Sequence, residues 1–300
     1  MSLIDKKWMI EFSKTKEKRL KTRPDLESKN KTIMLIGAHP DDSEFRACGT
    51  AIKMHDDGAR IVIVTISDGS AGHYRMDRKD LAARRRAEAM DAASLVDGKS
   101  ISLGIADGEV EPSLANRDKL IALIRSEAPD VIITNRANDY HPDHRYTAQL
   151  VQDASYMLMV PNVCPGIPPL RYVPLILYWG DQFKRPVEFS PDVVISIDDV
   201  LERKLDMLSR HESQVFEWLA WVDNMLDSVP PSDDKDGRMA FLMRLYQRRP
   251  NHLFSERFRP MLLARYGENG RSVVEAEAFE MSEYGYQATE EELGKLFMGY

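Results

Sequence analysis

Short apolar runs rich in β-branched residues recur along the first two thirds of the chain, with helical stretches between them. Each run is apolar nearly throughout, which is typical of strands covered on both faces of a sheet. Strands that alternate with helices form βαβ units, so we expect an α/β, Rossmann-like three-layer fold with a mainly parallel sheet. The predicted strands are Thr32–Ala38, Arg60–Ser67, Ser100–Gly104, Asp130–Asn135, Leu175–Trp179 and Val193–Ile197.

The helical stretches extend beyond the last predicted strand. Four helices are expected between strands, at Glu44–Asp57, Asp80–Val96, Ser113–Glu127 and His144–Met159. One long helix from Asp198 or Asp199 to about Leu226, a polar loop over 227–237, and helices near Arg238–Arg248 and Ser255–Arg265 are expected after them. We therefore divide the chain into a basic N-terminal arm (1–31), an α/β catalytic domain (32–226) and a helical C-terminal extension packed on that domain (227–300).

Charge and composition exclude several classes of function. The 300-residue chain has a net charge of −7, although residues 5–31 hold ten basic and five acidic side chains. The acidic body argues against nucleic-acid binding, and the basic arm is expected to be a solvated helix or an oligomer contact. No apolar run is long enough to span a bilayer, there is no signal region, and two cysteines cannot form a disulfide framework. These features predict a cytoplasmic protein.

Ionisable side chains follow two of the predicted strands. The first strand is followed by the segment AHPDDSE, which begins at Ala38. The fourth strand ends at Asn135, and HPDH follows at residues 141–144. Because ligands bind at the carboxyl ends of strands in open parallel sheets, the two clusters are expected to converge on one site.

The spacing of the two clusters suits a metal ion. His39 and Asp42 are three residues apart, as are His141 and His144, so each pair can face one point. Two histidines and one carboxylate leave coordination positions open, which is typical of a catalytic metal site. Asp41 must then point elsewhere, and it remains available for proton transfer.

Structural explanations compete with this interpretation. Asp42 could cap the following helix, Asp41 could bind loop amides, and His141 could be a loop histidine with satisfied hydrogen bonds. Each explanation is plausible for one cluster alone. It is weaker for two clusters that each follow a buried strand.

The paired motifs resemble those of the LmbE/PIG-L metal-dependent deacetylases. AHPDD-x-E followed about a hundred residues later by HPDH is the specific part of the resemblance. Supporting similarities are Leu81-Ala82-x-x-Arg85-x-x-Glu88, Leu103-Gly104 with Asp107-Gly108, His211-x-Ser213-Gln214 after Lys204, and Glu277-Ala278-Phe279. The resemblance covers about residues 32–215, with a weaker similarity near 277.

The resemblance implies a site and an activity. His39, Asp42 and His144 would bind zinc, although Fe²⁺ or another divalent metal could take its place. Asp41 would be the general base, and a protonated His141, oriented by Asp143, would stabilise the oxyanion. By resemblance Arg85 and Asp107 would contact substrate, and His73 is a further candidate from its place on the loop after the second strand. The expected reaction is zinc-dependent removal of an acetyl group from an N-acylated amino sugar or glycoconjugate.

Three other functions stay open at this point. Some relatives with this metal motif resemble hydratases or lyases of small unsaturated carboxylic acids. Two histidines and one carboxylate are also the ligands of mononuclear iron oxygenases. A nucleotide-binding module is disfavoured, because the spacing G-x-G-x-x-G is missing and carboxylates would repel phosphate.

An apolar stripe lies in the long predicted helix of the C-terminal third. Trp218, Leu219, Trp221, Val222 and Leu226 recur at helical spacing. A core or subunit interface is the first interpretation, which would fit a homo-oligomer, and a hydrophobic wall for a small-molecule substrate is the second.

Overall fold

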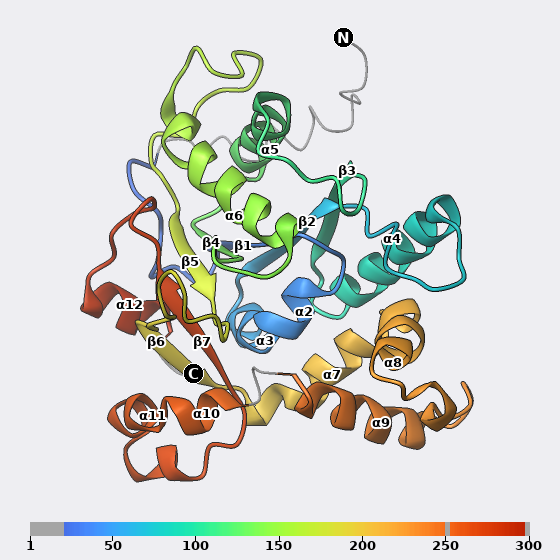
Figure 1. Ribbon diagram of the computed structural model, residues 1–300. Coiled ribbons are helices and arrows are strands. Elements are labelled where there is room, and N and C mark those ends of the chain that lie inside the picture. The colour runs from blue at the N-terminus through green and yellow to red at the C-terminus, as the bar shows by residue number, and fades with distance from the viewer. Residues whose placement is uncertain (1–20, 250–252, 298–300) are drawn as a thin grey trace.

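The computed structural model describes residues 21–249 and 253–297, and its centre is a seven-stranded sheet with helices on both faces (Figure 1). The strand order is β3-β2-β1-β4-β5-β7-β6, and β7 runs in the direction opposite to the other six strands. The strands are β1 (Thr32–Gly37), β2 (Arg60–Ser67), β3 (Lys99–Ile105), β4 (Val131–Thr134), β5 (Leu175–Trp179), β6 (Val193–Ser196) and β7 (Ala276–Met281). The expected α/β class and mainly parallel sheet are confirmed.

The alternation of side chains along each strand divides the core into two layers. Ile33 and Leu35 of β1 face one buried cluster, and Met34 and Ile36 face the other. The first cluster includes residues of α3 (Cys48–Asp56) and α12 (Glu290–Leu296). The second includes residues of α5 (Leu114–Glu127) and α6 (Pro142–Ser155). Burial on both faces explains why the strand sequences are apolar throughout.

The helices between strands lie close to their predicted positions. α4 (Arg78–Ser94) is capped by Asp77, whose side chain accepts from Lys79 N and Asp80 N. α5 is capped in the same way by Ser113. The predicted helix over Glu44–Asp57 is instead two helices, α2 (Asp42–Arg46) and α3, because Ala47 has non-helical backbone angles.

The long helix predicted from Asp198 or Asp199 to Leu226 is wrong. It is broken into η3 (Asp198–Val200), α7 (Leu201–Ser209), a π-helical turn η4 (Ser213–Trp218), α8 (Leu219–Val222) and η5 (Leu226–Ser228). The break has a local cause: the Ser213 N–H and hydroxyl donate to the Glu88 carboxylate, at 2.9 and 2.6 Å, so this amide does not continue a helix. The remaining helices of the described residues are η2 (Tyr156–Met159), α9 (Lys235–Gln247), α10 (Phe254–Arg257), α11 (Arg259–Tyr266) and η7 (Gly267–Arg271).

The C-terminal third also supplies a strand that the sequence analysis missed. β7 lies between β5 and β6, so residues 227–300 are not a purely helical extension. The charged Glu277 interrupts the apolar pattern that predicts a buried strand, although its side chain is only 2% exposed. Its carboxylate accepts from Gly49 N, Thr50 N and Lys204 Nζ at 2.7–2.9 Å, which compensates for its burial.

The predicted basic arm is described only from residue 21. Asp130 fixes this last part of the arm, because its carboxylate accepts from Lys21 Nζ, Asp25 N and Thr32 N. Residues 1–20 lie outside the described part of the chain. Among the described residues, no helix has the length and apolar character needed to cross a bilayer. The cytoplasmic location and the homo-oligomer stay predictions.

Candidate active site

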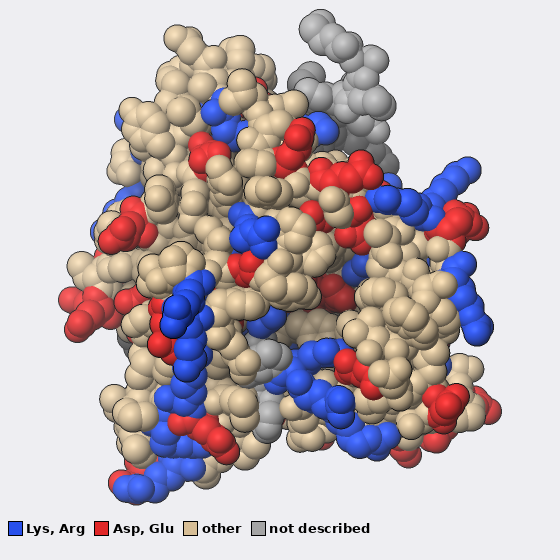
Figure 2. All heavy atoms as spheres, viewed as in Figure 1, with Lys and Arg blue, Asp and Glu red and all other residues tan. Residues whose placement is uncertain are grey.

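The two ionisable clusters meet where the strand order reverses. β1 lies between β2 and β4, so the connections that leave β1 and β4 go to opposite sides and leave a crevice at their carboxyl ends. His39 to Asp42 follow β1, and Asp139 to His144 follow β4. Both segments line one cavity of about 510 Å³. Figure 2 shows a hollow on this face, between the positions of α2, α8 and α9 in Figure 1, with acidic atoms in its floor.

Gly37 allows the chain to turn back on itself after β1. A Cβ atom at this residue would lie 2.8 Å from the Asp42 Cβ, so a larger residue would push Asp42 away. In the observed turn, Asp42 Oδ2 accepts from the amides of Ala38 and His39, both at 2.9 Å. The turn fixes one oxygen of Asp42 and directs the other toward His144.

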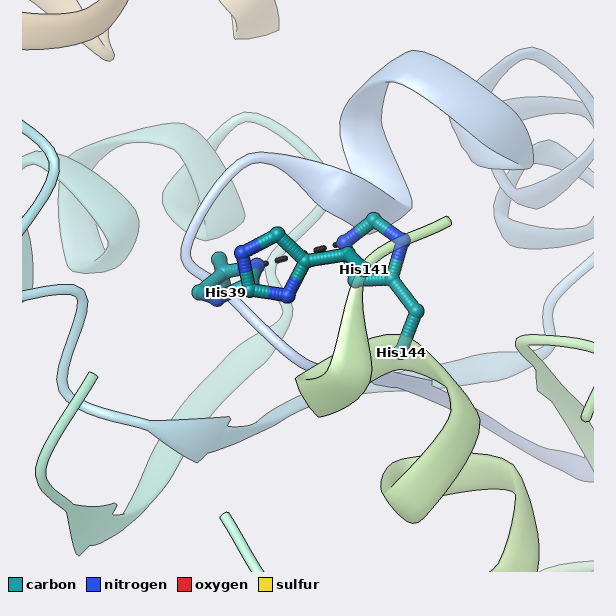
Figure 3. Close-up of side chains that lie close together, drawn as sticks. All are labelled: His39, His141 and His144. Atoms are coloured by element: carbon teal, nitrogen blue, oxygen red, sulfur yellow. Dashed lines mark hydrogen bonds between the residues drawn. The ribbon is translucent and has the colours of Figure 1, made fainter. Parts of the chain in front are cut away.

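Three predicted metal ligands lie close together, and His141 lies beside them. The ring nitrogens of His39, His141 and His144 include one set whose atoms all lie within 4.8 Å of one another. His39 Nδ1 lies 3.3 Å from His144 Nε2, and His144 Nε2 lies 3.4 Å from Asp42 Oδ1. Asp42 Oδ2, the fixed oxygen, lies 3.7 Å from His39 Nδ1. Tetrahedral zinc with bonds of about 2.1 Å has ligand atoms about 3.4 Å apart, so the two distances from His144 Nε2 match such an ion. Figure 3 shows the His39 and His144 rings turned toward each other, with His141 beside them.

A carboxylate lies behind each of the two facing imidazoles. His39 Nε2 lies 3.1 Å from Asp107 Oδ1 and 3.3 Å from Asp143 Oδ2. His144 Nδ1 lies 3.1 Å from Asp139 Oδ2. Metal-binding histidines usually donate their second ring N–H to such a partner, which fixes the ring and its tautomer. The arrangement leaves His39 Nδ1 and His144 Nε2 as the nitrogens available to a cation.

These carboxylates strongly shift the pKa values of both histidines. Burial lowers the pKa of His144, but Asp42 and Asp139 raise it to about 9. Burial also lowers the pKa of His39, but Asp107, Asp143 and Asp42 raise it well above its ordinary value. The cavity floor therefore attracts positive charge, which two protons or one divalent cation can supply.

Asp41 is held next to this floor in an unusual backbone conformation. Its φ is +123°, outside the regions that non-glycine residues favour. Arg85, which is 2% exposed, donates to the Gly69 and Pro40 carbonyls, and its Nη2 lies 3.3 Å from Asp41 Oδ1. Burial raises the pKa of Asp41 to about 6, although the Arg85 charge opposes this shift. Asp41 is thus a carboxylate suited to accept a proton near neutral pH.

His141 is placed differently from the sequence expectation. It caps α6, and its Nδ1 accepts the Asp143 backbone N–H at 3.1 Å. The Asp143 carboxylate instead contacts His39 Nε2 and the Gly108 amide. Burial and the charges of His39 and His144 lower the pKa of His141. In the structure the Asp143 backbone, and not its carboxylate, holds the His141 ring, and a neutral ring with this contact carries its proton on Nε2. The role of His141 stays a prediction.

The three residues expected to bind substrate mostly have other contacts. Asp107 lines the cavity, but one of its oxygens contacts His39 Nε2 and the other accepts the Ala71 N–H. Arg85 lines the cavity while it holds the loops around Asp41. His73 is not among the cavity-lining residues, because its Nε2 lies 2.8 Å from Glu217 and its Nδ1 accepts two loop amides. A substrate contact by His73 stays a prediction, and in this structure His73 contacts Glu217 and its own loop.

The sequence analysis missed two other residues of the site. Asp139 supports His144 from the loop after β4, and its position two residues before HPDH was the available signal. Gln214 is 2% exposed, lines the cavity and donates from Nε2 to the Gly72 carbonyl at 3.2 Å. The π-helical turn η4 carries Gln214 to the cavity. This residue is part of the similarity His211-x-Ser213-Gln214, but no role in the site is predicted for it from the sequence.

Comparisons with known proteins agree with this fold and these motifs. Residues 34–155 match the model of the family described as PIG-L: GlcNAc-PI de-N-acetylase. The diacetylchitobiose deacetylase of Thermococcus kodakarensis is 28% identical over 204 residues, which cover 64% of this chain and 73% of that protein. The 4-oxalmesaconate hydratase of Pseudomonas putida is 24% identical over 210 residues, which cover 66% and 80%.

A solved structure extends the likeness to almost the whole fold. The N,N′-diacetylchitobiose deacetylase of Pyrococcus horikoshii superimposes with a TM-score of 0.63 and 23% identity, over 95% of this chain and 94% of that one. At this identity the likeness supports the fold. The match to the PIG-L (LmbE-like) family model over residues 34–155 contains both ionisable clusters, so this part of the chain is similar to that family.

Proposed function

We propose that this protein is a zinc-dependent hydrolase that removes an acetyl group from an N-acylated amino sugar or glycoconjugate. The observation that carries the proposal is the triangle of His39 Nδ1, Asp42 and His144 Nε2, with Asp41 and His141 beside it in one cavity. The names of the relatives support the reaction class, since those of Thermococcus and of Bacillus cereus, a probable N-acetyl-glucosaminyl malate deacetylase, act on acetylated amino sugars.

His39, Asp42 and His144 would hold the metal. Bound zinc would lower the pKa of water and polarise the amide carbonyl. Asp107, Asp143 and Asp139 would keep the two imidazoles in place.

Asp41 would act as the general base. It would accept a proton from the water whose oxygen bonds to the amide carbon, and later deliver that proton to the nitrogen as the C–N bond breaks. The products would be acetate and a free amine. Burial favours this exchange, because it brings the pKa of Asp41 to about 6, close to the working pH.

His141 would stabilise the charge that develops on the carbonyl oxygen. Because its Nδ1 accepts the Asp143 amide, a neutral His141 can donate from Nε2. A donor aimed at the developing oxyanion is commonly worth several kcal/mol, so a neutral ring can fill this role.

Two variants test the assignment of roles. We expect Asp41→Asn to keep a full complement of zinc and lose most acetate release from N-acetylated sugars, because only the base is removed. His144→Ala should lose zinc. Metal content and acetate release are measured on the same samples. Near-full activity in Asp41→Asn would rule out the base, and full zinc in His144→Ala would rule out the ligand set.

A hydratase of a small unsaturated carboxylic acid is the second candidate. The similarity to the Pseudomonas putida hydratase over two thirds of this chain favours it. The same samples distinguish the two reactions, because hydration of an unsaturated diacid removes its ultraviolet absorbance and releases no acetate. Iron in the purified protein would leave the hydrolase proposal intact, since the test of function is the product.

A further inference from the structure

The cavity continues beyond the metal-binding floor along an apolar wall. The wall consists of Phe45 of α2, Trp218 of η4, Leu219 and Val222 of α8, and Tyr246 of α9. It contributes to the same cavity of about 510 Å³ that contains His39 and Asp41. A volume of this size lies within the range of sites that enclose a drug-sized ligand. The cavity therefore has room for more than the acetyl group and the reacting nitrogen.

The wall is built mainly by the part of the chain outside the family match. That match ends at residue 155, and four of the five wall residues follow it. The wall is continuous with a third buried cluster formed by α7, η4, α8 and α9, which includes Phe241, Leu245 and the wall residue Tyr246. The wall continues to the surface, where Val222 is 46% exposed. It thus leads from the reacting centre to solvent.

Aromatic contacts and an ion pair hold the wall in position. Trp218 stacks on Trp221 with ring centroids 5.2 Å apart, and Trp221 stacks on Tyr74 at 5.5 Å. Both oxygens of Glu217 accept from Arg84, at 2.6 and 3.0 Å. These contacts join η4 and α8 to the loop after β2 and to α4. A wall fixed in this way needs little ordering when a ligand covers it, which favours binding.

We propose that the wall binds an apolar aglycone, an aryl or alkyl group attached to the amino sugar, and that the enzyme selects such conjugates over sugars without one. The inference rests on the proposed deacetylase function. A sugar ring needs a polar partner for each of several hydroxyl groups, and Phe45, Leu219 and Val222 provide none. An aglycone lies away from the reacting amide and can follow the wall to the surface, and burying it there gains the free energy of the hydrophobic effect.

The experiment compares acetate release from methyl and benzyl glycosides of N-acetylglucosamine. We expect kcat/KM to be about tenfold higher for the benzyl glycoside, because filling an apolar pocket changes specificity by about this factor. In Val222→Asn the ratio of benzyl to methyl should fall about fivefold. The matched control is Val274→Asn, an exposed valine that is not among the cavity-lining residues, and it should keep the wild-type ratio.

The remaining outcomes separate the two proposals. Acetate release with equal kcat/KM for both glycosides would overturn the aglycone assignment and leave the deacetylase standing. A preference for the N-butanoyl over the N-acetyl methyl glycoside, with no effect of the aglycone, would assign the wall to the acyl chain and also overturn it. No release of acetate or butyrate from any glycoside, with zinc bound, would contradict the proposed function itself.

Discussion

The Arg85 guanidinium lies 3.3 Å from Asp41 Oδ1 and also donates to the carbonyls of Pro40 and Gly69. The buried Arg85 side chain therefore contacts both Asp41, whose backbone conformation is disfavoured, and the loop that contains Gly69. The Gly69 Cα lies so close that a Cβ there would be 2.6 Å from the guanidinium. This relationship makes Arg85 a positioning residue for Asp41, and Arg85 also lines the cavity.

Arg85→Lys should therefore reduce turnover without removing the metal. Lysine keeps the charge but cannot reach three acceptors from one planar group. We expect kcat to fall about 10- to 100-fold, since small misplacements at a reacting centre have effects of this size. Zinc content and kcat are measured together. Arg86→Lys, an exposed neighbour on α4, serves as the control and should match the wild type; zinc loss in Arg85→Lys would show a role at the ligands instead.

Asp107→Asn should weaken metal binding. Asp107 Oδ1 lies 3.1 Å from His39 Nε2, and His39 in turn lowers the pKa of Asp107 to about 2 against the effect of burial. Loss of a carboxylate behind a ligand histidine typically costs about 10- to 100-fold in metal affinity. A competition titration with a chelating dye measures the change. The exposed Asp153→Asn is the control. An unchanged affinity with a raised KM would assign Asp107 to the substrate, as the family resemblance implies.

The sequence predicts the central strands of the sheet because strands buried on both faces are recognisable as continuous apolar runs. β1, β2 and β4 are continuous apolar runs, and each lies within one or two residues of its predicted position. The two ionisable clusters follow strands that prove to be neighbours, and parallel strands end at one edge of a sheet. The position of the site is therefore contained in local patterns.

The partners of individual carboxylates are not contained in local patterns. Asp143 is adjacent in sequence to Pro142 of HPDH, yet its carboxylate lies on His39, 104 residues away. Glu277 looks like a solvent-facing residue until Lys204 of α7 and the amides of α3 are placed beside it. Both errors have one cause: a charged side chain can be buried wherever distant parts of the chain supply partners.

Arg125→Met should destabilise the fold without affecting the site directly. Arg125 is fully buried and donates to six carbonyls of the segment between Met157 and Ile167. Methionine would fill much of the space but leave these carbonyls without a donor. We expect a loss of at least about 3 kcal/mol in the free energy of unfolding, measured with urea. Lys119→Met, exposed on the same helix, is the control; a loss below about 1 kcal/mol would mean that water replaces the guanidinium.

Glu127→Gln should destabilise the protein near neutral pH and lose this effect in acid. Glu127 is 5% exposed, and its carboxylate pairs with Lys99 Nζ at 2.7 Å and with Arg60. Burial raises the pKa of Glu127, but Lys99 and Arg60 lower it below its usual 4.5. A carboxyl group with a lowered folded-state pKa stabilises the protein above the unfolded-state value, and this stabilisation disappears as pH falls through the folded-state value. We expect a loss of about 1–2 kcal/mol in the free energy of unfolding at pH 7, since both cations are partly exposed, and a smaller loss below about pH 4.

Urea unfolding across this pH range measures the loss, with the exposed Glu109→Gln as the control. A difference between wild type and Glu127→Gln that stays constant with pH would show that shape, and not charge, accounts for the contribution of Glu127.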